Sequence, residues 1–253
     1  MTSGGSGDRD GAGGRPSGLP GGRAEIHHAH RDVTGGWLRP AVFGAMDGLV
    51  SNFALIAGVA GGTSDAGIVA LAGLAGLAAG AFSMAGGEYV SVASQRELAL
   101  AELAVERREL TIRPEDEAEE LAQRYVSQGV EPGLAREVAR QISANPDRAL
   151  HVHAREELGV DPGDLPSPVL AAGSSFLAFA VGAAVPLLPY LFGFTVLWPS
   201  AVCTFVALFA AGALASRVTA RSWWYSGLRQ LAVGLTAAAL TFGLGNLIGA
   251  GGW

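Results

Sequence analysis

The sequence contains no lysine, and all of its 17 basic residues are arginines. Cysteine is almost as scarce, because Cys203 stands alone and has no partner for an intrachain disulfide. Charged side chains are missing from residues 169–216 and again from residues 230–253. The net charge of −6 argues against binding to the phosphate backbone of a nucleic acid. These absences exclude a disulfide-stabilised fold and a nucleic-acid-binding protein, and they leave long apolar segments as the main feature of the chain.

Signatures of common enzyme classes are missing as well. The sequence has no His-Glu-x-x-His zinc motif and no Gly-x-x-x-x-Gly-Lys phosphate loop. Glu25-x-x-His28 has no second Glu-x-x-His with which to build a di-iron site. Ser174 and Ser175 have no His or Asp companion on their apolar segment. We therefore expect no enzyme and no catalytic cofactor.

The first part of the chain has the composition of a tail. Residues 1–20 lack the apolar core of a secretory signal, so we expect no cleaved leader there. Residues 1–33 are predicted to be a disordered, Gly-rich tail. His27, His28 and His30 lie in this tail, and weak metal capture by these imidazoles remains open beside a purely solvated role.

The apolar segments are long enough to cross a membrane. The chain is 49% hydrophobic and 16% charged, with a mean hydropathy of +0.32, and one helical crossing needs about 20 apolar residues. The predicted fold is therefore an all-α polytopic membrane protein with five transmembrane helices and an inserted cytoplasmic helical domain. After the tail, the predicted divisions are 34–95 (helices 1–2), 96–166 (cytoplasmic domain) and 167–253 (helices 3–5). The crossings are expected at about 41–62, 67–93, 169–189, 194–215 and 230–250.

The arginines predict the orientation. Arg39 precedes the first crossing, Arg96 follows the second, and Arg217, Arg221 and Arg229 are expected between the fourth and the fifth. The positive-inside rule then places the N-terminus and residues 96–166 in the cytoplasm. With an odd number of crossings, the C-terminus lies outside.

Small residues predict where the helices meet. Glycine pairs four residues apart begin at Gly44, Gly76 and Gly245, and such pairs allow membrane helices to approach closely. The first pair brackets Asp47. Chance occurrence in Ala/Gly-rich helices is the alternative for at least one of the three.

Two acidic residues lie inside the first two apolar segments. Asp47 is the only charge between residues 41 and 62, and Glu88 is the only one between residues 66 and 95. A charge at the membrane centre costs roughly 2.5–3.5 kcal/mol even on lenient scales, and it usually marks an ion path. Met84 lies one turn from Glu88, and its thioether together with the Asp47 carboxylate favours transition metals over Mg²⁺ and Ca²⁺. Glu88 is interpreted either as a hand-over group or as a hydrated residue near the interface.

The segment 96–168 has a different composition, with 16 of the 23 acidic residues. Its Pro and Gly breaks predict helices at about 96–110, 114–128, 131–143 and 146–158. Residues three or four apart share a helix face, which groups Glu106 with Glu109, Glu117 with Glu120, and His153 with Glu156 and Glu157. The predicted metal ligands are Glu106, Glu109, Glu117, Glu120, His153 and Glu157. The alternative is a solvated acidic surface whose excess charge is neutralised by Arg107, Arg108, Arg113 and Arg155.

Three motifs in order resemble the vacuolar iron transporter family: PAVFGAMDGLVS over residues 40–51, AGAFSMAGGEYVSVASQ over residues 79–95, and AREELG over residues 154–159. The similarity runs from about Gly35 to the C-terminus. The resemblance implies a homodimer that moves Fe²⁺ and similar divalent metals out of the cytosol in exchange for protons. It also implies a path lined by Asp47 and Met84, and a cytoplasmic domain that binds metal through Glu106, Glu109, Glu117, Glu120 and Glu157. His153 stands where some members have a methionine ligand, so altered selectivity or pH response is expected.

The residues and the resemblance together predict a divalent-metal/proton antiporter, exporting Fe²⁺ and also Mn²⁺ or Co²⁺. We expect a bacterial member in the plasma (inner) membrane, with metal ions, protons, lipid and a second copy of the chain as its partners. A proton and a metal ion compete for one carboxylate in a low-dielectric site, which is the minimum that exchange requires. The alternative is a membrane-anchored protein that buffers or senses metal without transporting it.

Overall fold

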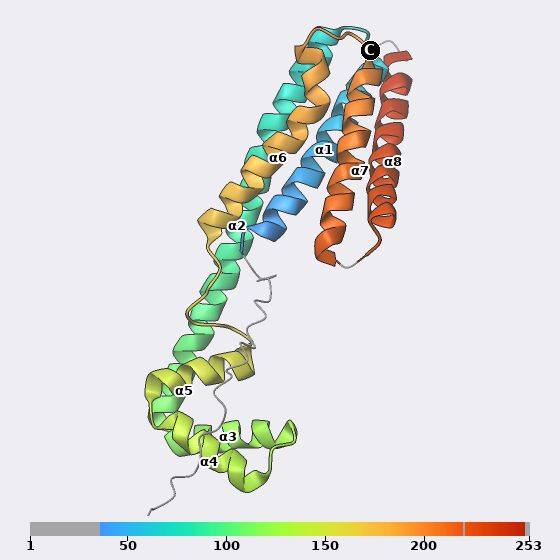
Figure 1. Cartoon of the computed structure of the whole chain (residues 1–253). Coiled ribbons are helices and arrows are strands. Elements are labelled where there is room, and N and C mark those ends of the chain that lie inside the picture. The colour runs from blue at the N-terminus through green and yellow to red at the C-terminus, as the bar shows by residue number, and fades with distance from the viewer. Residues whose placement is uncertain (1–35, 220, 251–253) are drawn as a thin grey trace, which may run out of the picture. The chain divides into compact units, whose positions relative to one another are not determined.

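The structure is a computed structural model that describes residues 36–219 and 221–250. Residues 1–33, the predicted tail with its histidines, lie outside this part of the chain. The described residues form helices and no strand, which confirms the predicted all-α polytopic membrane protein (Figure 1). Within residues 36–219 and 221–250, five helices are long and apolar enough to cross a membrane. They are α1 (Leu38–Gly62), α2 (Ala66–Ile112), α6 (Pro168–Leu191), α7 (Leu197–Thr219) and α8 (Trp223–Ala250).

The last two membrane helices differ from the prediction at the ends that face each other. α7 continues to Thr219 and α8 begins at Trp223, whereas the sequence placed these ends near residues 215 and 230. Arg217 and Arg229 therefore belong to helices and do not lie in the connection. Long arginine side chains extend along a helix toward the membrane surface, so a helix can continue past the end of its apolar span.

α1 is the centre of the membrane bundle, where it packs against α2, α6, α7 and α8. Glycines make the closest of these contacts possible. A Cβ atom at Gly44 would lie 2.7 Å from the main-chain oxygen of Ser175, and one at Gly48 would overlap with that of Phe179, both on α6. The other two predicted glycine pairs also lie at helix contacts within the chain: Gly76 and Gly80 face α1 and α6, and Gly245 and Gly249 face α1.

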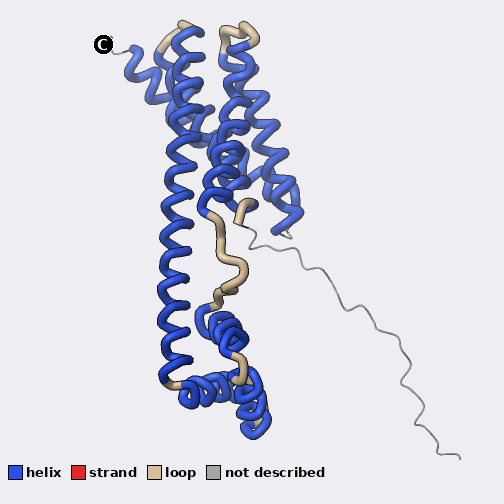
Figure 2. Tube along the Cα trace, turned by 90° about the vertical axis from the view of Figure 1, so that its left-hand side faces the viewer, coloured by secondary structure: helices blue, strands red, loops and turns tan. Residues whose placement is uncertain are grey.

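α2 is a 47-residue helix that begins in the membrane bundle and ends in the segment of acidic helices (Figures 1 and 2). Asp65 caps its first turn by accepting hydrogen bonds from the amides of Gly67 and Ile68. No Gly or Pro follows Gly87 in this helix. The usual causes of a kink are therefore absent from its second half.

The acidic segment folds into short helices that all begin at a proline: α3 (Pro114–Ser127), α4 (Pro132–Ser143) and α5 (Pro146–His153). Proline suits the first turn because its missing N–H would have no partner there. α5 continues into a π-helical turn, η1 (Ala154–Leu158), which ends at Gly159 in the left-handed conformation, with φ 64°. A core of Leu121, Ala122, Ala135 and Ala139 joins α3 to α4, and Leu103, Leu150 and Ala154 pack α5 and η1 against α2.

Candidate metal sites

The three residues predicted to line a transport path face the same cavity in the membrane bundle. Asp47 of α1 and Met84 and Glu88 of α2 line a space of about 350 Å³. The remaining lining includes Ser51 of α1, Gly80 of α2 and Phe179 of α6. The cavity therefore brings together a carboxylate from one helix and a thioether and a second carboxylate from another.

The local sequence explains why these side chains meet. Met84 and Glu88 are four residues apart and lie on one face of α2. Gly80, one turn before Met84, has no side chain, so the ring of Phe179 reaches the backbone of α2 there. Gly48, next to Asp47, lets α1 lie directly on α6. Small residues thus create both the close packing of the three helices and the space between them.

A second cluster of ligand-type side chains lies in the acidic segment. Nδ1 of His153 is 3.0 Å from Oε1 of Glu106, 3.1 Å from Oε1 of Glu157 and 3.8 Å from Oε2 of Glu117. These residues come from the end of α5, from α2, from η1 and from α3. One ligand atom from each of Glu106, His153 and Glu157 lies within 4.8 Å of the others, which is the spacing of donors around one metal ion.

The cluster is buried and poorly satisfied by hydrogen bonds. His153 has no exposed surface, and Glu106 and Glu117 are each 7% exposed. Within the described part of the chain, neither ring nitrogen of His153 has a hydrogen-bond partner, and Oε1 of Glu106 and Oε1 of Glu157 have none either. Buried polar atoms are almost always paired in hydrogen bonds. These nitrogen and oxygen atoms converge without forming hydrogen bonds, which is the arrangement expected of ligand atoms around a cation.

Electrostatic repulsion acts on the same residues. Burial, followed by the nearby charges of Glu157 and Glu117, raises the pKa of Glu106 to about 7. Burial, and then the charges of Glu120 and Glu109, also raise the pKa of Glu117. Glu109 and Glu120 are themselves exposed. The structure therefore places four of the predicted ligands in contact and the other two at the rim, close enough to repel them.

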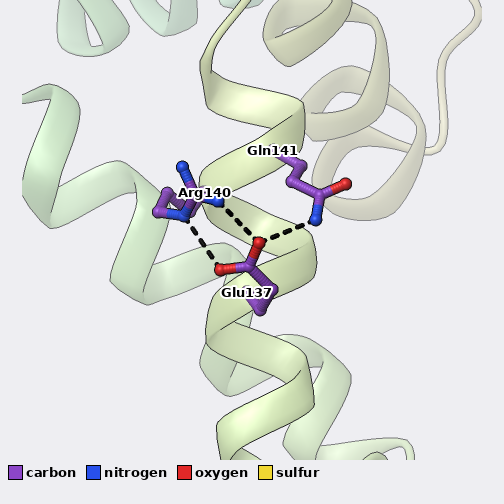
Figure 3. A network of polar contacts seen from close by, with 3 residues as sticks. All are labelled: Glu137, Arg140 and Gln141. Carbon is purple, nitrogen blue, oxygen red and sulfur yellow. Dashed lines mark hydrogen bonds and ion pairs between the residues drawn. The ribbon is translucent and has the colours of Figure 1, made fainter.

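Another acidic residue of the segment provides a comparison, because both of its carboxylate oxygens accept hydrogen bonds. Glu137 on α4 accepts hydrogen bonds from Arg140, at 2.6 and 2.9 Å, and from Gln141, at 2.7 Å (Figure 3). The hydrogen bonds from Arg140 and Gln141 lower the pKa of Glu137 to about 2. No arginine in the described residues pairs in this way with Glu106 or Glu117.

The solvated-surface interpretation therefore fails for the buried members of the cluster. Among the four arginines proposed to neutralise it, Arg155 forms an ion pair with Asp161, and Arg107, Arg108 and Arg113 form none with described residues. Glu156, which spacing grouped with His153, points elsewhere and accepts a hydrogen bond from Gln128 at 3.1 Å.

Two features of the sites were not predicted from the sequence. The π-helical turn places Glu157 against His153, and Arg124 donates a hydrogen bond to the main-chain oxygen of Glu156 inside this turn. Wide turns of this kind occur often at functional sites, but they have no simple sequence signal. Asn52, a buried amide on α1 outside both sites, was not singled out either, although a lone amide in an apolar segment is a visible signal.

Fold and sites together define a class: an all-α, polytopic membrane protein that has a carboxylate–thioether cavity among its membrane helices and a buried His–carboxylate cluster in a separate group of short helices. The chain belongs to the VIT family, whose sequence model matches residues 38–246. This confirms the resemblance seen in the three motifs.

Curated relatives support the same assignment. The chain is 32% identical to "Vacuolar iron transporter 1" of Arabidopsis thaliana over 226 residues, which cover 88% of this chain and 90% of that protein. It is 33% identical to "Vacuolar iron transporter 2" of Oryza sativa subsp. japonica over 225 residues, which cover 87% of this chain and 92% of that protein. It is 46% identical to "Vacuolar iron transporter" of Acanthamoeba castellanii over 155 residues, which cover 61% of this chain and 56% of that protein. These relatives are from plants and an amoeba, so they do not confirm the expected bacterial origin.

Proposed function

We propose that the protein transports divalent transition-metal ions, Fe²⁺ first and also Mn²⁺ or Co²⁺, out of the cytosol in exchange for protons. The observation that carries this proposal is the shared cavity of Asp47, Met84 and Glu88 between membrane-spanning helices. An ionisable residue inside the membrane is costly, and such residues usually mark an ion path. The names of the relatives, all iron transporters, support the same conclusion.

The donor types in the cavity support the choice of metal. A carboxylate oxygen is a hard ligand, whereas the sulfur of Met84 is soft, and Mg²⁺ and Ca²⁺ prefer oxygen alone. Asp47 and Met84 are the proposed ligands on the path. Glu88, on the same wall of the cavity, is the proposed group that passes metal between the acidic helices and Asp47.

The acidic helices are proposed to collect metal on the cytoplasmic side. His153, Glu106, Glu117 and Glu157 supply nitrogen and oxygen donors of the kind that first-row transition metals accept. Glu109 and Glu120 add negative charge at the rim, which attracts cations toward the cluster. With imidazole as the nitrogen ligand, the site is proposed to accept Fe²⁺, Mn²⁺ and Zn²⁺ and to have its own metal preference.

Proton exchange follows from the chemistry of a carboxylate on the path. Metal binding requires the ionised carboxylate, and an apolar environment favours the protonated form. A proton and a metal ion therefore exclude each other at this site. Asp47 and Glu88 are both candidates for the coupled group.

The assembly and the location are part of the same proposal. We propose a homodimer in the plasma (inner) membrane, with the N-terminus and residues 96–166 in the cytoplasm and the C-terminus outside. The vacuolar names of the relatives make an internal membrane the competing location. Fluorescent tagging in the source cell separates the two.

The test is metal flux into proteoliposomes across a set pH gradient. Wild-type protein is expected to carry Fe²⁺, Mn²⁺ or Co²⁺ and to discriminate against Mg²⁺. Asp47→Asn keeps the size of the side chain but removes its charge, so it is expected to abolish pH-driven flux. Flux like that of the wild type in this variant would reject Asp47 as a transport residue.

The same assay separates transport from metal buffering. A buffering or sensing protein would bind metal at the His153 cluster, and the vesicle interior would stay empty. Preference for Mg²⁺ would contradict the argument from donor types.

A further inference from the structure

Asn52 is a buried amide on α1, a little more than one turn beyond Asp47 in the direction away from the acidic helices. Its side chain is 2% exposed. Its Nδ2 group donates a hydrogen bond to the main-chain oxygen of Ala183 on α6, at 2.7 Å. Its Oδ1 atom is buried and has no hydrogen-bond partner among residues 36–219 and 221–250. A buried acceptor without a partner is energetically unfavourable, so it calls for an explanation.

The unpaired oxygen points toward α2. A Cβ atom built on Gly76 would lie 2.6 Å from Oδ1 of Asn52, so only glycine leaves room for this oxygen. Gly76 lies one turn of α2 from Gly80, which lines the Asp47 cavity. Asn52, Gly76 and Ala183 thus form the next layer of the bundle outward from the cavity.

The ring of Phe179 stands between the two layers. Phe179 lines the Asp47 cavity but is itself only 3% exposed. Its ring fills the space next to Gly80 and belongs to an apolar cluster with Ala183, against which Met84 packs. Phe179 therefore links the wall of the Asp47 cavity to the layer that contains Ala183 and Asn52.

We propose that Oδ1 of Asn52 is a second coordination point for the transported metal ion, on the outward side of Phe179. This inference rests on the proposed transport function. An amide oxygen is a neutral ligand, so it binds a divalent cation more weakly than the Asp47 carboxylate does and lets the ion move on. The hydrogen bond to Ala183 holds the amide so that its oxygen, and not its nitrogen, faces the path.

Two substitutions at this position separate ion coordination from a purely structural role. Asn52→Asp keeps the oxygen, and Asn52→Leu has a similar volume but no polar atom; both lose the hydrogen bond to Ala183. Asn52→Leu is expected to lower the maximal flux by at least about tenfold, the change that corresponds to about 1.4 kcal/mol. Asn52→Asp keeps an oxygen ligand but makes it an anion that holds the cation more tightly, so it is expected to lower the KM for metal and to retain more flux than Asn52→Leu. Asn246→Leu, at an exposed asparagine of α8, is the matched control and is expected to behave as wild type.

Equal loss of flux in both variants would assign Asn52 a structural role and overturn the proposal, as would normal flux in Asn52→Leu. Absence of flux in the wild-type protein would instead overturn the proposed function, and the Asn52 assignment with it.

A second measurement does not depend on how well Asn52→Leu folds. In a Cys203→Ala background, Asn52→Cys places a thiol at the proposed coordination point, and a thiolate binds the soft ion Cd²⁺ tightly. Cd²⁺ is expected to block flux through Asn52→Cys at concentrations that leave the Cys203→Ala parent active, and a chelator is expected to restore it. Equal sensitivity of the two proteins to Cd²⁺ would show that position 52 does not face the path.

Discussion

His153 holds three glutamates around one buried imidazole, although its neighbour two residues earlier is a surface histidine. Within about 4 Å of Nδ1 lie carboxylate oxygens from three different helices. In contrast, the side chain of His151 is 50% exposed and lies 3.9 Å from Asp161. One sequence segment therefore offers a ligand candidate and its own control.

His153→Ala is expected to weaken metal binding to the cytoplasmic cluster by at least about tenfold, because even changes outside the ligand shell cost about 10- to 100-fold. His151→Ala is expected to leave the affinity unchanged. Titration of the purified protein with Co²⁺ or Zn²⁺, followed by calorimetry, measures both. Equal metal affinities in the two variants would reject His153 as a metal ligand.

Glu106 predicts how metal binding depends on pH. Its pKa rises from 4.5 to about 7 in the metal-free protein, so the carboxyl group is protonated below pH 7 and must lose this proton when a metal binds. The affinity for metal is therefore expected to increase as the pH rises from 6 to 8, with proton release that shows in the buffer dependence of the binding enthalpy. Glu106→Gln is expected to flatten this dependence, and an unchanged slope in the variant would contradict the assignment.

The same shift affects stability, and the sign follows from linkage. A group whose pKa is higher in the folded state binds its proton more tightly there, so protonation of Glu106 stabilises the fold. This contribution to the free energy of unfolding is complete below pH 4.5 and is lost as the pH rises through about 7. Glu117 acts in the same direction. Above pH 7 the metal-free cluster is a source of strain that a bound cation relieves.

Among the helices, the contact between α1 and α6 depends most clearly on glycine. Gly44 and Gly48 of α1 and Gly182 of α6 all leave no room for a side chain at the crossing. A Cβ atom at any of the three would meet main-chain atoms of the other helix, which have no rotamers to change. Because Asp47 lies inside this contact, the position of its carboxylate depends on the same glycines.

Gly48→Ala is expected to destabilise the protein by roughly 1–3 kcal/mol, the usual cost of overpacking a tight core, and to lower metal flux. Gly173→Ala, on the exposed side of α6, meets no atom within 4 Å and is expected to be neutral. Thermal unfolding in detergent compares the two variants under one condition. Equal unfolding temperatures would show that the helices separate easily at Gly48.

Most helices were predictable because their signals are local. Apolar length defined the membrane helices, and Pro114, Pro132 and Pro146 marked the starts of α3, α4 and α5. α7 and α8 continue past the apolar spans expected at 194–215 and 230–250, since a helix can extend beyond its apolar span. Local spacing could not reveal that α2, α3 and η1 meet at His153, or that Gly76 faces Asn52, since both depend on how distant helices pack.

At the scale of the whole molecule, five crossings are expected to put the two ends of the chain on opposite sides of the membrane. The connection between α1 and α2 should then be outside, whereas the acidic helices should be inside. Ser64 and Ser127 are exposed residues in these two places.

A membrane-impermeant maleimide applied to intact cells is expected to label Ser64→Cys and not Ser127→Cys, each in a Cys203→Ala background. Permeabilised cells are expected to label both, which controls for accessibility. Labelling of Ser127→Cys alone in intact cells would invert the orientation and, with it, the proposed direction of transport.

The long reach of α2 gives the protein a mechanical property. From Glu88 to Ile112 the helix has no Gly or Pro. This half of α2, which contains Glu106, is therefore expected to be rigid. Gly86 and Gly87 lie two and three residues after Met84, and a side chain at either would touch nothing within 4 Å. If the acidic helices move when they bind a cation, the helix is expected to bend at Gly86 and Gly87, next to the proposed metal ligand Met84.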